Sequence, residues 1–230
     1  AKEADAVAMA KLQVYKQQIS RLKTTLKKLY YRPQSMLFAD YAGANATFSV
    51  HANALAVLCG VVPATEAAGL LQRAMAAKDL TQPTIYWHFY LFEALAKAGL
   101  GNDYLKHTGV WQQMLEAGCT TWPETGLKSR SECHAWGASP NYHLYKILLG
   151  VQPAAPGFSK VTIAPHPCGA DSIAGKVPTP AGDVAVSLQR TAPGNWQANI
   201  HLPAGVSGQL VWQGRNYPLQ PGKQSLLLKP

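Results

Sequence analysis

The sequence predicts two structural parts joined by a linker: a set of helical hairpins, then a small antiparallel β-sandwich. Up to about residue 150, apolar residues recur every three or four positions, which is typical of amphipathic helices. After a Pro- and Ala-rich linker at 151–157, apolar and polar residues alternate, which is typical of half-buried strands. We therefore expect a helical domain at 1–150 and a β-sandwich domain at 151–230.

Six helices are expected in the first part. They cover residues 6–31, 49–59, 63–75, 83–98, 104–117 and 140–149, each bounded by Gly, Pro or a loop. The first carries one apolar stripe (Leu12, Tyr15, Ile19, Leu22, Leu26 and Leu29), and the fourth is apolar almost all round, which predicts burial on most faces. Short loops pair six helices into three hairpins. Three hairpins are half of a six-hairpin toroid, so the predicted architecture is a partial (α/α)6 toroid of two concentric helix rings.

The second part has the repeated turns of a sandwich. Alternation runs through residues 161–163, 184–188, 196–202, 210–212 and 226–228. Turn-forming Gly, Pro, Asn and Asp residues recur between these segments, every 8–12 residues. Short alternating segments between regular turns predict a small antiparallel β-sandwich of about seventy residues.

Composition argues for a packed globular protein of 230 residues, with 47% hydrophobic and 14% charged residues. The formal net charge of +9 is concentrated at the start: the first 32 residues hold eight Lys or Arg and two acidic residues. A solvated helix face explains this cluster better than a phosphate-binding track, because aromatic residues are not interleaved with the charges. We therefore expect no nucleic-acid partner.

The sequence also shows no pattern typical of membrane-spanning, cofactor-binding or metal-binding proteins. No apolar run reaches the roughly 20 residues of a membrane span, and the opening residues do not resemble a signal peptide. Phosphate-binding and dinucleotide-binding glycine motifs are absent, and the four cysteines lack metal-ligand spacing. Buried free thiols are the default expectation, with a Cys119–Cys133 bridge left open. We expect no cofactor, no metal and no membrane contact.

Residues 120–136 concentrate the side chains that can carry chemistry. Two Trp, two Glu, one Arg and one His lie within these seventeen residues, while the flanking segments are rich in Ala, Leu, Lys and Gly. Indole rings offer flat apolar surfaces for sugar rings, and carboxylates move protons or accept hydroxyl hydrogen bonds. The stretch is therefore predicted to line a carbohydrate pocket, with Glu124 as the best catalytic candidate.

Each candidate also has a structural interpretation. Glu124 would otherwise cap the chain or pair with Arg130, whereas Glu132, the rival base, is expected to form a structural ion pair. His134 either donates to a sugar hydroxyl or serves an internal hydrogen bond. Trp122 and Trp136 can either stack on a sugar or fill the core. One of the two is expected in each role.

Three candidates lie outside this stretch. Trp87 is on the all-apolar fourth helix, so a core position is favoured over sugar contact. Asp40 is a weak sugar-binding candidate in the loop at 34–48. His51 lies beside the start of the second helix, where capping and packing are as plausible as sugar contact.

Six segments together resemble a known family. They are 38–40 (FAD), 49–58 (SVHANALAVL), 89–95 (FYLFEAL), 120–124 (TTWPE), 133–141 (CHAWGASPN) and 149–158 (LGVQPAAPGF). Their order and spacing resemble the C-terminal part of bacterial α-L-rhamnosidases of glycoside hydrolase family 78. That family has an (α/α)6 toroid followed by a β-sandwich, in agreement with the fold expected from periodicity.

The resemblance implies an inverting hydrolase that releases terminal α-L-rhamnose without a cofactor. It implies that Glu124 is the general base and that His134 faces the sugar. Pro123 separates Trp122 from Glu124, which departs from members that place the two side by side. The general acid would come from the first half of the toroid, which has no counterpart in these 230 residues. A secreted or periplasmic parent is favoured.

The chain alone is therefore expected to be an inactive portion of a glycosidase acting on rhamnosides. An incomplete toroid would expose apolar helix faces, which predicts a homodimer or association with the missing N-terminal half. The alternatives are a non-catalytic carbohydrate-binding or interaction module, and a polysaccharide lyase on the same helical architecture. A lyase would require Arg beside a uronate, and Arg130 is the only Arg near the site.

Overall fold

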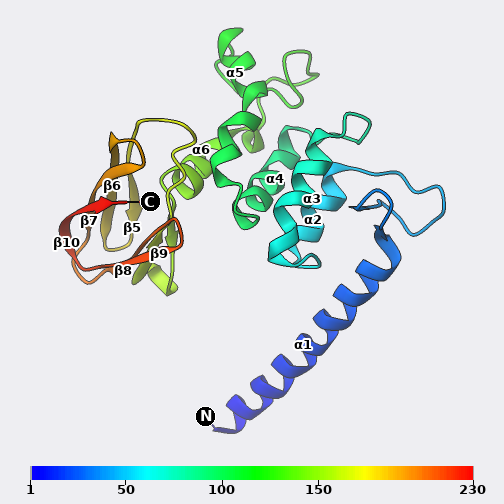
Figure 1. Ribbon diagram of the computed structural model, residues 1–230, viewed down its shortest axis with the longest axis horizontal. Coiled ribbons are helices and arrows are strands. Elements are labelled where there is room, and N and C mark those ends of the chain that lie inside the picture. Colours follow the sequence, from blue (N-terminus) through cyan, green and yellow to red (C-terminus); the bar gives the residue numbers. More distant parts are fainter. Residues whose placement is uncertain (1, 230) are drawn as a thin grey trace. The chain divides into compact units, whose positions relative to one another are not determined.

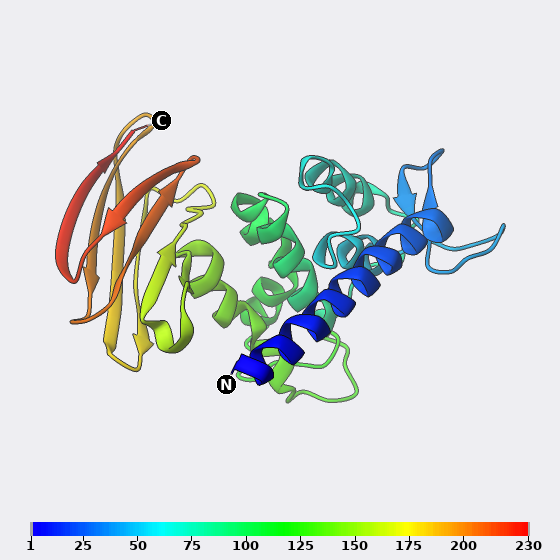
Figure 2. The same cartoon turned by 90° about the horizontal axis from the view of Figure 1, so that it is seen from below.

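A computed structural model describes residues 2–229 and the side chains of residues 5–229. The chain divides into two compact units, Ala1–Gly99 and Leu100–Pro230. Figures 1 and 2 show the course of the chain, and each unit is described by itself. The first unit is mainly helical. The second contains short helices followed by two sheets.

The first unit contains four α-helices and one short hairpin. Its elements are α1 (Lys2–Tyr30), β1 (Tyr31–Arg32), β2 (Leu37–Phe38), α2 (Val50–Leu58), α3 (Ala64–Ala76) and α4 (Ile85–Lys97). Helix α2 packs against both α3 and α4 (Figure 1). Ser49 caps α2 by accepting a hydrogen bond from the Ala52 N–H. Pro63 is the N-cap of α3 rather than its first residue, so this helix begins one residue later than expected.

Helix α4 is less buried than its apolar sequence predicts. Its second half is enclosed, with Phe92 and Leu95 fully buried. Its first half is half-buried or exposed, from Tyr86 through Tyr90. The expectation of a helix buried on most faces is therefore wrong for the first turns, where large aromatic side chains remain partly accessible.

The apolar stripe of α1 is exposed to solvent. Every member of the stripe keeps more than a third of its surface accessible, and Leu22 is 61% exposed. An amphipathic helix normally buries this face. The side chains of α1 therefore present both the basic cluster and an uncovered apolar surface.

The second unit begins with five short helical segments. They are η1 (Gly101–His107), α5 (Gly109–Glu116), η2 (Ala135–Ala138), α6 (Ser139–His143) and the π-helical η3 (Leu144–Leu148). The helix expected at 104–117 is thus two segments, and the one expected at 140–149 changes from α to π geometry. A further 3-10 turn, η4 (Pro156–Phe158), lies among the first strands.

Eight strands form two four-stranded sheets, visible in Figures 1 and 2. The strands are β3 (Val151–Pro153), β4 (Lys160–Ile163), β5 (Ser172–Thr179), β6 (Gly182–Ala192), β7 (Asn195–Leu202), β8 (Ser207–Trp212), β9 (Arg215–Leu219) and β10 (Gly222–Leu228). One sheet has the order β10-β7-β6-β5 and the other β3-β4-β8-β9. All pairings are antiparallel except β4 with β8, which run parallel.

The inward-facing positions of both sheets form one apolar core. Val161, Leu188, Leu202 and Leu210 are fully buried members of this core. Alternation along the strands therefore predicted the buried face correctly. The predicted fold class, helical toroid-like part plus β-sandwich, is confirmed, whereas the domain boundary at 150/151 stays a prediction.

The described residues contain no membrane-spanning helix and no metal-binding cluster. None of the helices within 2–229 is both long and apolar enough to cross a bilayer. No group of three His, Cys, Asp or Glu side chains converges in that range. All four cysteines are free thiols, so Cys119 and Cys133 form no bridge. Cys59 and Cys133 are exposed, which contradicts the expectation of buried thiols.

Candidate active site

The Trp- and Glu-rich stretch folds back on itself in the second unit, between α5 and η2. The Glu124 N–H donates to the Ser131 carbonyl at 3.0 Å, and the His134 N–H donates to the Trp122 carbonyl at 2.9 Å. The Thr121 hydroxyl donates to the Glu132 carbonyl. These bonds hold the two arms of the loop side by side. The fold thus places Glu124 and His134 in one small structure.

Glu124 forms a two-pronged ion pair with Arg130. Arg130 Nε lies 2.8 Å from Glu124 Oε2, and Arg130 Nη2 lies 3.1 Å from Oε1. The Glu124 side chain is 19% exposed and that of Arg130 is 84% exposed. The hydrogen bond from Arg130 lowers the pKa of Glu124 below its ordinary value, and the nearby His134 acts in the same direction. Glu124 is therefore an ionised carboxylate at neutral pH.

The structure shows which of the two glutamates, Glu124 or Glu132, forms an ion pair. Pairing of Glu124 with Arg130 was the structural alternative to a catalytic role, and this pairing is present. Glu132 was expected to form an ion pair instead. Its side chain is exposed and pairs with no cation in the described part of the chain, so that expectation is wrong. Two of the roughly four lone-pair directions of the Glu124 carboxylate remain for other partners.

His134 lies against the indole ring of Trp136 and close enough to Glu124 to affect its pKa. Its ring centroid is 4.3 Å from that of Trp136, which is 40% exposed. His134 Nδ1 is buried and has no hydrogen-bond partner among the described residues. A buried polar nitrogen without a partner is uncommon and costs free energy. Nδ1 would reach a group from outside the chain only after the imidazole turned, because the atom has no accessible surface in this arrangement.

The two Trp residues of the loop have different surroundings. Trp122 is half-buried, and its Cβ packs directly on Gly137, where an added Cβ would lie only 2.4 Å away. Trp136 is more exposed and stacks near His134. Trp122 therefore packs within the loop and Trp136 is the more accessible of the two, while the sugar-stacking role expected for one of them stays a prediction.

Asp40 lies at the start of α2 in the first unit. Its two carboxylate oxygens accept hydrogen bonds from the Ser49 hydroxyl at 2.5 Å and the Thr47 hydroxyl at 2.8 Å. Ser49 in turn caps α2. The sequence patterns did not single out Thr47 or Ser49. An N-cap preference at Ser49 would have predicted its position, because Ser is favoured there.

His51 and Trp87 meet on neighbouring helices α2 and α4. Their ring centroids are 4.5 Å apart in an edge-to-face arrangement, and Tyr90 lies 4.9 Å from Trp87. Burial lowers the pKa of His51, and the charge of Asp40 partly opposes this shift. Trp87 is half-buried rather than a core residue, so the favoured core position is wrong. The first unit therefore groups Asp40, His51 and Trp87 near the start of α2.

The seven predicted site residues thus fall into two local groups. Glu124, His134, Trp122 and Trp136 are held together by the loop of the second unit. Asp40, His51 and Trp87 are held together by α2 and α4 of the first. Each group combines a carboxylate, an imidazole and at least one indole ring. Such a set can hydrogen-bond sugar hydroxyls and stack on a sugar ring.

Comparison with known proteins identifies the C-terminal region. Residues 150–226 match the family described as bacterial alpha-L-rhamnosidase C-terminal domain. An alpha-L-rhamnosidase of Alteromonas sp. (strain LOR) is 34% identical over 79 residues, which is 34% of this chain and 8% of that protein. The β-sandwich region therefore has a sequence relationship to rhamnosidases.

Solved structures extend the likeness into the helical part. The family 78 rhamnosidase of Bacillus sp. GL1 matches with a TM-score of 0.73 and 28% identity, covering 83% of this chain and 22% of that one. An α-L-rhamnosidase of Streptomyces avermitilis, solved with L-rhamnose, matches with a TM-score of 0.70 and 17% identity over 94% of this chain. The matched region is 24% of the Streptomyces avermitilis chain. The 230 residues thus span about a quarter of these solved relatives.

Proposed function

Because the chain resembles the C-terminal portion of a bacterial α-L-rhamnosidase in sequence and fold, we propose that its parent enzyme hydrolyses terminal α-L-rhamnosides. The likeness to the Bacillus sp. GL1 rhamnosidase over 83% of this chain carries this proposal, since it includes helices as well as sandwich. The substrates are rhamnose-containing glycosides or polysaccharides, and no cofactor takes part.

Glu124 is the proposed general base. It would hold a water molecule and accept its proton as the water attacks the anomeric carbon. A base must be ionised at the working pH, and the pairing with Arg130 favours ionisation by lowering the pKa of Glu124. The lone pairs that Arg130 leaves uncovered are available to the water.

His134 and Trp136 are proposed sugar contacts. The Nδ1 atom of His134 is buried and has no partner among the described residues, so a sugar hydroxyl would bind it after the imidazole turns toward the ligand. The accessible ring of Trp136, 4.3 Å from the imidazole, would stack on the apolar face of the same sugar. Trp122 would support them through its packing on Gly137.

Asp40, His51 and Trp87 are proposed as a second group of sugar contacts. The Asp40 carboxylate is oriented by two hydroxyl donors, and Trp87 presents a partly accessible ring beside His51. Burial keeps His51 neutral near pH 7 because its pKa is lowered. A neutral imidazole both donates and accepts, which suits hydroxyl recognition.

The mechanism we infer is inversion, and the 230-residue chain would be inactive by itself. Inversion needs a general acid and a general base about 6.5–9.5 Å apart, with the water between the base and the sugar. The family resemblance implies that the general acid lies in the first half of the helical toroid, which has no counterpart in these 230 residues. Loss of one such group typically removes about 10²-fold or more of rate.

An interaction module is the second candidate function, because one observation favours it. The apolar stripe of α1 is exposed, which is unusual unless another surface covers it. This function is compatible with the first, since the covering surface would be a second copy or the remaining part of the parent. A lyase is less favoured because Arg130 is already bound to Glu124.

The test uses 4-nitrophenyl α-L-rhamnoside. The purified 230-residue chain should show no turnover above buffer. In an active parent enzyme that contains this chain, Glu124→Gln should lower kcat by at least about 10²-fold while rhamnose binding persists. Glu132→Gln is the matched control and should leave kcat within about twofold. Full activity of Glu124→Gln together with an inactive Glu132→Gln would transfer the role to Glu132.

A further inference from the structure

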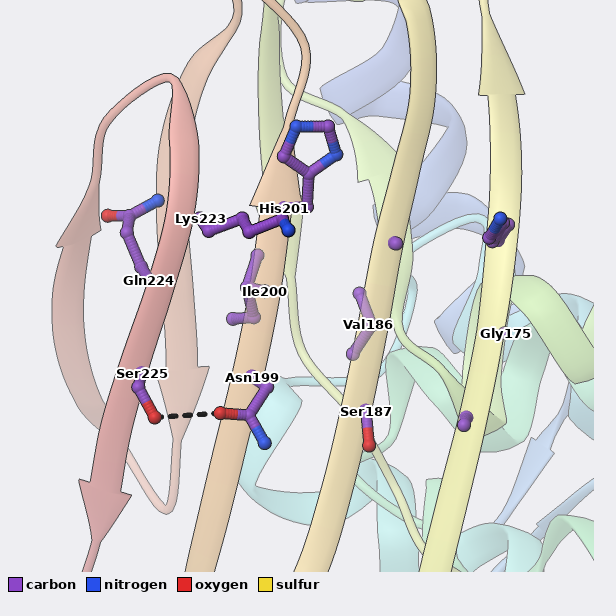
Figure 3. A pocket seen from close by; sticks show the side chains of 12 residues that line it. Gly175, Val186, Ser187, Asn199, Ile200, His201, Lys223, Gln224 and Ser225 are labelled. Carbon is purple, nitrogen blue, oxygen red and sulfur yellow. Dashed lines mark hydrogen bonds between the residues drawn. The ribbon is translucent and has the colours of Figure 1, made fainter.

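The outer face of the β10-β7-β6-β5 sheet is hollowed into a groove of about 660 Å³. This volume is within the roughly 300–1,000 Å³ typical of small-molecule sites. The groove lies within the second unit and uses none of the candidate catalytic residues. Its lining comes from the middle of all four strands (Figure 3).

Strand register arranges the outward side chains of this groove in two rows. Pairing places Ala174, Ser187, Asn199 and Ser225 opposite one another in the first row. Pairing places Lys176, Ala185, His201 and Lys223 in the second. Residues two apart on a strand are about 7 Å apart, and four strands span about 14 Å. The two rows thus form a surface the size of a short oligosaccharide.

The hollow exists because small residues line its β6 and β5 side. Ala174 and Ala185 project outward from β5 and β6 and leave space that larger side chains would fill. The longer side chains of Asn199 and His201 rise on β7, and Lys223 rises on β10. An apolar floor with polar walls suits a sugar ring, because its C–H face packs on methyl groups while its hydroxyls reach the walls.

The first row offers hydrogen-bond donors that the protein does not use. Figure 3 shows the Ser225 hydroxyl donating to Asn199 Oδ1, at 2.7 Å. Gln197 Nε2 donates to the same Ser225 oxygen at 2.8 Å. This chain orients the Asn199 amide, whose NH₂ group has no partner among the described residues. The Ser187 hydroxyl likewise has none there.

The second row carries positive charge without a carboxylate. Lys176 and Lys223 are exposed and form no ion pair within residues 2–229, and His201 lies between them on β7. By register the nearest carboxylate on this face is Asp183, one row further along, and it too is unpaired. A ligand with a carboxylate would therefore find two lysines whose charges are uncompensated.

We propose that this sheet face binds an acidic oligosaccharide, with sugar hydroxyls on the Ser187–Asn199–Ser225 row and a uronate carboxylate on the Lys176–His201–Lys223 row. The choice of a carbohydrate rests on the proposed function, and the requirement for acidity rests on the unpaired lysines. The sandwich would hold a charged polysaccharide strand independently of the hydrolytic site.

Binding of trigalacturonate to the 230-residue chain tests the proposal by calorimetry. The neutral probe is the fully methyl-esterified trisaccharide, which keeps the backbone and removes the charge. Trigalacturonate should bind measurably, and the ester at least about tenfold more weakly. Lys176→Gln and Lys223→Gln should each weaken binding about two- to fivefold, since exposed ion pairs are worth up to about 1 kcal/mol.

Two further variants separate the groove from general electrostatic attraction. Ala185→Leu fills the floor, keeps every charge and should weaken binding about tenfold or more. Lys160→Gln removes an exposed lysine from β4 of the other sheet and should leave affinity unchanged. Circular dichroism of each variant confirms that the fold is intact.

The proposal is overturned if trigalacturonate fails to bind at millimolar concentration, or if the ester binds as well. Equal loss in Lys160→Gln, or tighter binding of a phosphate polymer than of trigalacturonate, would also overturn it in favour of unspecific anion attraction. Glu124→Gln should not change this affinity. Failure of the groove is therefore distinguishable from failure of the hydrolytic proposal, which is measured by turnover.

Discussion

At the scale of single residues, Arg130 controls the ionisation of Glu124. The guanidinium contacts both carboxylate oxygens, and its own side chain is mostly in solvent. Exposed pairs contribute little to stability. The pair matters more for the protonation state of the carboxylate and for the direction in which its free lone pairs point.

Replacing Arg130 by Gln should raise the pKa of Glu124 toward its ordinary 4.5. Because the folded pKa is lowered in the native protein, the pair stabilises the fold above pH 4.5 and loses this effect as pH falls through the folded value. A ¹³C NMR titration of the Glu124 carboxyl measures the shift.

Lys128→Gln is the matched control, since it removes the same charge from the same exposed loop. The Glu124 pKa should barely change in that variant. Equal shifts in both variants would mean that general loop charge, rather than the two hydrogen bonds from Arg130, lowers this pKa.

Residue types drew attention to the stretch at 120–136, but they did not predict its side-chain pairings. The cluster at 120–136 was visible because its Trp, Glu, Arg and His stand among bland neighbours. The choice of partner for Arg130 was not visible, because Glu124 and Glu132 are both near it in sequence. The backbone bonds that fold the loop decide the pairing, and they leave no pattern in side-chain types.

At the scale of elements, close backbone packing shapes the loop. Gly137 in η2 lies against the Cβ of Trp122, while its carbonyl accepts a hydrogen bond from Trp111 Nε1 at 2.7 Å. Only a residue without a side chain allows the close contact with Trp122. Position 137 thus fixes where Trp122 sits relative to η2.

Gly137→Ala should destabilise the protein by about 1–3 kcal/mol, the usual cost of an overpacked buried position. An added Cβ would lie 2.4 Å from the Trp122 Cβ, so one of them must move. Urea unfolding followed by tryptophan fluorescence measures the loss.

Gly109→Ala serves as the control, because a Cβ there meets nothing within 4 Å. It lies at the start of α5 and should be neutral or slightly stabilising. If the two variants were equally stable, the contact between Gly137 and Trp122 would not constrain the loop.

Elements with a regular apolar periodicity were predicted from the sequence. Helical segments that change geometry along their length were not. The α1, α2 and α3 helices and the strands β4, β6, β7, β8 and β10 followed their apolar spacing. The strands β5 and β9 were not predicted, and β3 lies in the segment that was expected to be a linker. The break at Thr108 between η1 and α5, and the π-helical end at η3, were missed. Both keep an approximately helical spacing, so apolar periodicity does not distinguish them from one continuous α-helix.

At the scale of the whole molecule, helix α1 presents an uncovered apolar stripe. Its stripe includes Ile19 and Leu22, both half or more exposed. Exposed stripes of this kind favour association, since burial releases about 25 cal/mol per Å². We expect a second copy of the chain to cover it when no other partner is present.

Light scattering after size exclusion should therefore show a mass that rises with concentration. Ile19→Glu combined with Leu22→Glu should shift the chain to monomer, because both charges enter the stripe. Gln17→Glu lies on the opposite side of α1 by helical spacing and should have no effect. A concentration-independent monomer mass for the unmodified chain would contradict the prediction.

The parallel pairing of β4 with β8 determines how the sandwich can assemble. Lys160 is paired with Ser207 across these two strands. The β8 strand follows β5, β6 and β7 in the sequence, so the β4–β8 pairing can form only after those three strands have been synthesised. The β10 strand similarly returns to β7, past β8 and β9. Neither sheet is completed by neighbouring hairpins alone, so the slow step of folding is the closure of distant segments. During synthesis β4 could pair with β3 on one side, but its other edge would stay unpaired and open to aggregation until β8 emerged.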